Sequence, residues 1–152
     1  MSKFHFRLET LLKLKITFRD QKNTELKEIL TAQDTLLQQK KEIDEEMQSA
    51  LGHSLEDAKP GLLDVDRLIS GHQELLRLKM AAKEKIQLER QLEPHIKQRQ
   101  QALIEADQEV RILEKLKEKQ SQQHQQVLDK REAKQMDELA TQVHYRNNWK
   151  GS

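Results

Sequence analysis

The chain has 152 residues, of which 35% are charged, 35% are hydrophobic and 3% are aromatic. Average globular chains hold about 25% charged and 45–50% apolar residues, so this composition argues against a compact enzyme built on a single core. The chain has only 4 glycines and 2 prolines. Its common residues are strong helix formers and not the Pro, Gly and Ser that are typical of disordered chains. The composition therefore predicts long helices.

The formal net charge is +1 and the chain has no cysteine. A nearly neutral chain has no overall field that would draw it onto nucleic acid or an acidic membrane, and a lack of thiols fits a reducing compartment. No apolar run approaches the ~20 residues that span a bilayer, and residues 1–8 lack the apolar core of a secretory signal. We expect a cytoplasmic protein that binds no nucleic acid and has no transmembrane segment.

A first helix is predicted over residues 4–51, which contain neither Gly nor Pro and in which apolar residues recur at steps of three and four. The heptad a positions are Leu12, Arg19, Leu26, Gln33, Lys40 and Met47, and the d positions are Leu8, Lys15, Lys22, Ile29, Leu36, Ile43 and Ala50. Ile16, Leu30, Leu37 and Leu51 broaden this stripe at the flanking e position. Polar residues at 19, 22, 33 and 40 weaken such a seam, but they can fix its register.

The connection is predicted at residues 52–61, because this stretch is the only cluster of helix breakers. A second helix is predicted over residues 62–141, capped by Asp64 or Asp66, with an interruption at Ser70-Gly71 and a bend at Pro94. The Gln-rich stretch 117–126 has no apolar residue and little reason to be buried. Residues 147–152 are expected to be frayed.

These elements predict an all-α fold: one coiled-coil domain over residues 1–152, formed as an antiparallel two-helix hairpin. The second helix is longer, so we expect it to overhang the start of the first. A second register would place residues 19–25 beside residues 117–126 and fold residues 52–93 as an apical cap. The acidic end of the first helix, around Glu46, can face the basic start of the second, where Arg67, Arg77, Lys79, Lys83 and Lys85 lie. This complementarity favours the hairpin modestly, since exposed ion pairs contribute only ~0–1 kcal/mol each.

No pattern of residues predicts a catalytic, cofactor-binding or metal-binding site. The six histidines are scattered and form no i, i+4 pair, and no glycine-rich phosphate loop occurs. The carboxylates have no predicted cavity that would remove water from them and shift their pKa values. We therefore expect no enzyme activity and no cofactor.

The two ends of the chain carry the features that predict contact with a partner. Residues 1–19 hold five basic residues and only Glu9 as an acidic one, and this basic segment has no obvious partner within the chain. Phe4, Phe6 and Phe18 lie near the start, Tyr145 and Trp149 lie near the end, and the middle has no aromatic residue. One interpretation is that the aromatic residues complete the seam between the helices. The other is that they form a docking site for another protein.

The opening stretch Lys3-Phe-His-Phe-Arg-Leu-Glu-Thr-Leu-Leu-Lys-Leu-Lys15 resembles the start of the flagellar FliJ family, in which an aromatic residue and Arg-Leu precede a Leu-Leu pair and basic residues. The closing Gln135-Met-Asp-Glu-Leu-Ala140, followed by Tyr145-Arg146, resembles the C-terminal signature of that family. The resemblance implies a component of the flagellar type III protein export apparatus, similar in form to the central stalk of rotary F-type ATPases. Such a component sits in the export ATPase hexamer, promotes its assembly, links it to the export gate and handles export chaperones.

Under this resemblance, residues at the two ends of the chain are expected to bind the ATPase: Phe4, Arg7, Leu8, Leu11, Leu12, Lys15, Met136, Asp137, Glu138, Leu139 and Arg146. Beyond the loop, His72, Leu75 and Leu76 are the candidates for the end that faces the export gate. The alternative is a generic coiled-coil tether or holdase chaperone of another system. A nucleic-acid-binding helical dimer is disfavoured, because the N-terminal basic residues are separated by Glu9 and by hydrophobic residues.

Overall fold

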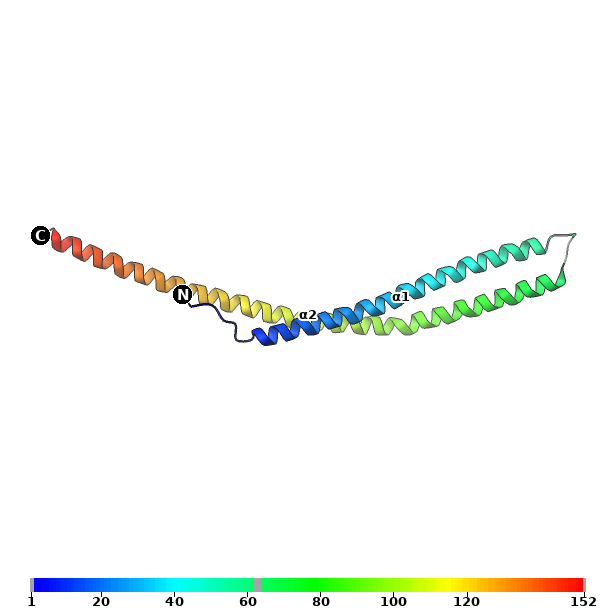
Figure 1. The fold of residues 1–152 in the computed structure, drawn as a ribbon, viewed down its shortest axis with the longest axis horizontal. Helices are drawn as coiled ribbons and strands as arrows, with labels where there is room; N and C mark the ends of the chain where they lie inside the picture. The colour runs from blue at the N-terminus through cyan, green and yellow to red at the C-terminus, as the bar shows by residue number, and fades with distance from the viewer. Residues whose placement is uncertain (1, 62–63, 152) are drawn as a thin grey trace. The chain divides into compact units, whose positions relative to one another are not determined.

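The computed structural model describes residues 2–61 and 64–151 and contains two helices, α1 (Glu9–Asp57) and α2 (Val65–Lys150). The helices run antiparallel and pack against each other, α2 is the longer, and the described residues form no strand (Figure 1). The prediction of an all-α two-helix hairpin is confirmed. The chain divides into two compact units: residues up to Arg19 and from Ala106 onward form the first, and Asp20–Glu105 form the second. That the whole chain is one domain stays a prediction.

The seam of α1 follows the heptad that the sequence predicts. Every assigned a and d position from Leu8 to Ala50 is buried or half-buried, including the polar ones. Leu12, Ile29 and Leu36 are the most buried of them. At the e position Ile16 and Leu30 are half-buried, whereas Leu37 and Leu51 are exposed. The stripe is therefore nearly the a/d seam of a simple coiled coil.

The seam of α2 also alternates steps of four and three, but several of its members are polar or small, which hid the pattern in the sequence. The buried and half-buried residues along it are Gly71, Leu75, Leu78, Ala82, Lys85, Glu89, Leu92, Ile96, Arg99, Leu103, Ala106, Val110, Leu113, Lys117, Gln120 and His124. Leu78 is only 2% exposed and Val110 is fully buried, whereas Leu76, Met80 and Ile86 lie outside the seam and are exposed.

Polar pairs between the helices define the register in both units. In the first unit, Lys15 Nζ lies 2.8 Å from Glu109 Oε2, and Arg19 pairs with Asp107 at 3.8 Å. In the second unit, Lys40 pairs with Glu89 at 2.6 Å, and the Arg99 guanidinium donates to the Glu25 carbonyl at 2.7 Å. Because residue 19 lies beside residue 107, the register that would pair residues 19–25 with 117–126 is wrong.

The predicted charge match near the loop is present in one weak pair. Arg77 Nη2 lies 3.9 Å from Glu46 Oε2, and both side chains are exposed. The same guanidinium binds Glu74 on its own helix at 2.6 Å, which raises the pKa of Arg77 and lowers that of Glu74. The contribution to the hairpin is small, since the pair is exposed and Glu74 competes for the guanidinium.

Helix bounds differ from the predictions at the loop. α1 continues through Gly52 to Asp57, because an exposed glycine costs a helix only about 1 kcal/mol, and backbone bonds such as Ala58 N to Ser54 O close its last turn. The turn uses Gly61, whose φ of 120° suits glycine. Asp64 caps α2 by accepting from the Asp66 N–H at 3.1 Å. Residues 62 and 63, the predicted start of the second helix, lie outside the described residues.

The second helix is not interrupted where the sequence predicted it and ends later than predicted. α2 runs through Ser70-Gly71 and through Pro94 without ending, so the predicted interruption is wrong. A bend at Pro94 stays a prediction. The helix also continues to Lys150, past the predicted end at residue 141, and residues 147–150 are helical and not frayed.

The N-terminal segment, residues 2–8, is not helical, which corrects the predicted start at Phe4. It lies along α2 in the first unit (Figure 1). Phe6 is 3% exposed and packs with Leu12 and Val110, while the Phe4 ring lies 5.8 Å from the His124 ring. Extended chain covers about 3.3 Å per residue against 1.5 Å in a helix, so this segment reaches further along α2 than another helical turn would. It therefore half-buries His124, within the stretch expected to be exposed.

Candidate partner-binding surfaces

Some of the predicted N-terminal site residues pack inside the first unit, and others are exposed at its surface. Leu12 is 4% exposed and belongs to the core with Phe6 and Val110, and Phe4 and Leu8 pack against that core. Lys15 is half-buried and paired with Glu109. These residues hold the first unit together, which leaves Arg7 and Leu11 as the predicted residues that are exposed at the surface.

Leu11 belongs to an apolar stripe that was not predicted from the sequence. Leu11, Leu14 and Phe18 are spaced at i, i+3 and i+7, so they share one face of α1, and all three are exposed, Leu14 by 64%. We call them the N-terminal stripe. The heptad assignment placed positions 14 and 18 outside the seam, and their apolar character there was the signal that could have revealed them.

The C-terminal site residues lie on the part of α2 that extends beyond the N-terminal segment (Figure 1). Every residue from 129 to 151 is exposed, and this C-terminal extension includes Met136, Asp137, Glu138, Leu139 and Arg146. Met136 is 69% exposed, and Leu139 and Val143 are each 56% exposed. Met136, Leu139 and Val143 share one helix face, which we call the C-terminal stripe. Val143 was not predicted because it lies between the two stretches, 135–140 and 145–146, that resemble the family signature.

The basic N-terminal segment has partners within the chain, which corrects the expectation that it has none. Lys15 and Arg19 pair with Glu109 and Asp107 on α2. Glu9, the single acidic residue of the segment, lies 2.8 Å from Lys117 Nζ. The hydrogen bond from Lys117 and its positive charge outweigh desolvation and lower the pKa of Glu9. Of the five basic residues, Lys3, Arg7 and Lys13 remain exposed.

The residues proposed for the gate-facing end lie in the second unit and do not form one surface. His72 and Leu76 are exposed, whereas Leu75 is half-buried in the seam of α2. A shallow groove lies next to them, between the ends of the helices, and Gly71, Glu74 and Leu78 line its α2 side. His72 and Leu76 therefore flank this groove and do not line it.

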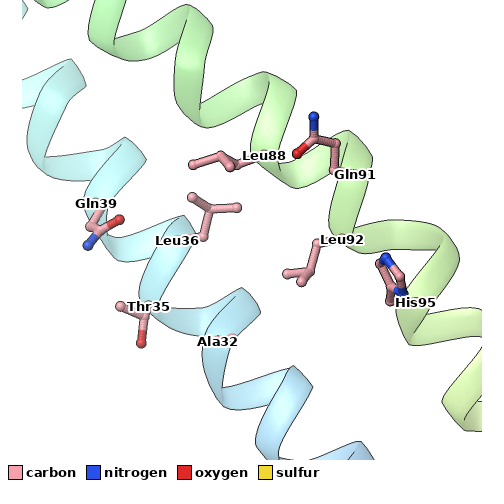
Figure 2. A pocket seen from close by; sticks show the side chains of 8 residues that line it. All are labelled: Ala32, Thr35, Leu36, Gln39, Leu88, Gln91, Leu92 and His95. Atoms are coloured by element: carbon pink, nitrogen blue, oxygen red, sulfur yellow. The ribbon is translucent and has the colours of Figure 1, made fainter.

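Another groove of the second unit lies between the middle parts of α1 and α2. Leu36 of α1 and Leu88 and Leu92 of α2 point into the space between the helices, as Figure 2 shows. The remaining lining residues are Ala32, Thr35, Gln39, Gln91 and His95. Small and polar side chains beside the seam leave this groove open, and its lining has one titratable group and no carboxylate.

The described residues form neither a metal site nor a membrane-spanning stretch. No group of three or more His, Cys, Asp or Glu residues in residues 2–61 and 64–151 is placed to hold a metal ion. Over the same residues, neither helix contains a stretch long and apolar enough to cross a bilayer.

The family model described as "Flagellar FliJ protein" matches residues 4–148 of the chain. The chain belongs to the FliJ family. It is thus a component related to flagellar protein export, as the resemblance of its two ends implied. No curated protein and no solved structure matches it significantly. The FliJ match covers the whole hairpin, including the N-terminal stripe and most of the C-terminal extension.

Proposed function

We propose that this FliJ protein is a non-catalytic stalk of the flagellar export ATPase ring, which promotes assembly of the ring and couples it to the export gate. The observation that carries the proposal is the distribution of exposed apolar residues in the first unit. The N-terminal stripe and the C-terminal stripe together present six large apolar side chains to solvent, three on one face of each helix. Apolar residues grouped in this way mark protein-binding surfaces.

The hairpin also has the mechanical properties that a stalk requires. Within each unit, helix packing through a heptad seam gives a stiff element, and interhelical pairs such as Lys40–Glu89 in the second unit fix its register. The outer surface is polar, and polar contacts can be exchanged one at a time. A ring of identical subunits can therefore hold such a surface without locking to a single orientation.

The proposal places the first unit in the ring and the second unit toward the gate. Arg7 and Leu11 with the N-terminal stripe, and Met136, Leu139 and Arg146 on the C-terminal extension, would contact the ATPase. His72 and Leu76, exposed in the second unit, would face the export gate. The protein would then act at the cytoplasmic face of the cell membrane, held there by its partners. Export chaperones are a further class of partner that the resemblance implies.

The experiment measures ATP turnover and hexamer formation by the purified flagellar ATPase, with and without this protein. Leu11→Ala with Leu14→Ala removes two exposed side chains of the N-terminal stripe and should abolish stimulation while leaving helical content unchanged. The matched control is Leu37→Ala with Ile86→Ala, two exposed side chains of the second unit. It should stimulate like the parent. If the parent has no effect on the ATPase, the stalk function is wrong and a generic tether or holdase becomes the better reading.

A further inference from the structure

The C-terminal extension has a heptad of its own, distinct from the seam that binds α1. Residues 132, 136, 139, 143, 146 and 150 are spaced by four and three, so they share one helix face, and all are exposed. Met136, Leu139 and Val143 occupy its centre. Glu132 lies at one end of the face, and Arg146 and Lys150 lie at the other.

This face does not continue the intrachain seam. The α2 seam ends with Val110, Leu113, Lys117, Gln120 and His124, and the same spacing continues to 127, 131, 134, 138 and 141. Positions 131, 134, 138 and 141 hold Arg, Lys, Glu and Thr, so the seam loses its apolar character there. The C-terminal stripe lies one to two residues, or about 100–200° of helix rotation, away from it. It is therefore suited to a different helix from α1.

We propose that the C-terminal stripe pairs with the same stripe of a second copy of this chain, in antiparallel orientation. The charges at its ends choose the orientation. A parallel, in-register pair would place Glu132 against Glu132, Arg146 against Arg146 and Lys150 against Lys150. An antiparallel pair places Glu132 of each copy opposite Lys150 of the other, so the repulsions at 132 and 150 become two attractions and the contact between the two Arg146 side chains is removed.

The antiparallel register also gives each apolar residue a fitting neighbour. Leu139 of each copy packs on Val143 of the other, and this contact occurs twice about the two-fold axis. Met136 packs on the aliphatic stem of Arg146 of the second copy, and the guanidinium reaches water at the edge. Ala140 lies beside Ala140 of the second copy, where a small side chain allows the helices to approach. Three apolar residues per helix make a short interface, so the dimer forms at high protein concentration.

The pairing occupies a segment that the proposed function gives to the ATPase, so the dimer and the ring-bound form exclude each other. The inference does not rest on that function, because it follows from the charges and spacing of the extension alone. Its tests use the full chain without ATPase. If no dimer were found, the stalk proposal would still stand. If the protein had no effect on the ATPase, the dimer proposal would still stand.

The first test measures the dimer dissociation constant by sedimentation equilibrium, from micromolar to millimolar protein. Glu132→Lys and Lys150→Glu should each weaken the dimer about tenfold or more, because each turns two attractions into two repulsions. The double charge swap should restore the parent's constant. Circular dichroism checks that the single variants keep the parent's helical content. A parent that stays monomeric at every concentration, or single variants that dimerise like the parent, would overturn the proposal, as would a double swap that fails to restore pairing.

The second test determines the orientation by disulfide cross-linking. The parent has no cysteine, so the introduced thiols are the only ones that can react. Ala133→Cys and Asn147→Cys place thiols next to the paired face at positions that meet only in the antiparallel dimer. A mixture of the two variants should form a disulfide-linked heterodimer under mild oxidation, whereas each variant alone should form little. Efficient homodimers of the Ala133→Cys variant alone would indicate parallel pairing and overturn the orientation.

Discussion

Lys40 of α1 and Glu89 of α2 form an ion pair of 2.6 Å at the position where a coiled coil normally places two apolar side chains. Both side chains are about one-third exposed, so water still reaches the pair. Lys40 is an a residue of the α1 heptad, and Glu89 is a member of the α2 seam. A pair of this kind contributes little net stability, but it penalises every register in which either charge would meet an apolar residue.

The first prediction follows from this pair. Lys40→Leu or Glu89→Leu alone should lower the free energy of unfolding by about 1 kcal/mol, because each leaves a half-buried charge without its partner. The double Leu variant should be as stable as the parent or more stable. Thermal unfolding followed by circular dichroism measures all four proteins. If the double variant were as unstable as the sum of the singles, the pair would contribute no coupling.

Substituting alanine for either of two glycines near the loop should have opposite effects on the free energy of unfolding. Gly52 lies inside α1 with no atom within 4 Å of the position that a Cβ would take, so Gly52→Ala should raise stability by about 0.5–1 kcal/mol. Gly61 also has open space, but its φ of 120° strains any residue with a Cβ, so Gly61→Ala should lower stability by about 1 kcal/mol or more. Chemical denaturation compares the two variants. Equal responses would contradict the assigned backbone conformations.

The sequence predicted the hairpin and the α1 seam because in α1 the apolar residues themselves carry the heptad, at Leu12, Ile29 and Leu36. The α2 seam was harder to find. It passes through Lys85, Glu89 and Arg99, which face α1 but have no apolar signal, and the apolar Leu76, Met80 and Ile86 lie outside it. Once the α1 seam is known, antiparallel pairing determines which α2 residues oppose it, but a single sequence does not identify those pairs.

Two features of the N-terminal end could not be predicted from the sequence, each for a physical reason. Family resemblance selected Leu12 because it belongs to the opening motif, but a leucine in a motif serves packing as often as binding, and Leu12 is buried. The non-helical N-terminal segment was not predicted because Phe4 has helical spacing with Leu8 and Leu11, and no glycine or proline separates them. Their burial against α2 decides the backbone, and that contact is not visible in local sequence.

A pH effect is expected from Glu9. Its pKa is lowered in the folded protein by Lys117, so this carboxylate stabilises the fold at pH values above its ordinary pKa of about 4.5. As the pH falls through the lowered folded pKa, the carboxylate becomes protonated and that stabilisation is lost. Glu9→Gln should therefore have a lower melting temperature than the parent at pH 7. The difference between the two melting temperatures should become smaller in acid.

The control for this experiment is Glu118→Gln, which replaces an exposed carboxylate of α2, next to Lys117, with a carboxamide. It should melt like the parent at pH 7 and also in acid. Melting temperatures are measured between pH 7 and pH 3. If Glu118→Gln changed the pH dependence of the melting temperature as much as Glu9→Gln does, the role assigned to the Glu9 carboxylate would be contradicted.

The last prediction separates binding from folding at two residues of the basic stretch 1–19. Arg7 is exposed, whereas Lys15 is half-buried and holds Glu109 at 2.8 Å. Arg7→Glu should therefore leave the melting temperature unchanged and weaken binding to the ATPase. The weakening should be greater at low salt than at high salt, because exposed charges are screened over about 8–10 Å at physiological ionic strength.

Lys15→Glu should instead lower the melting temperature, since it places two carboxylates against each other in the first unit. This variant should weaken ATPase binding only because the first unit is less stable. Adding Glu109→Lys in the same chain should restore both stability and binding. Titrations at two salt concentrations, together with melting curves, measure these responses. If Arg7→Glu bound the ATPase as tightly as the parent at low salt, the charge of this segment would have no part in docking. The N-terminal stripe would then have to bind through its apolar side chains alone.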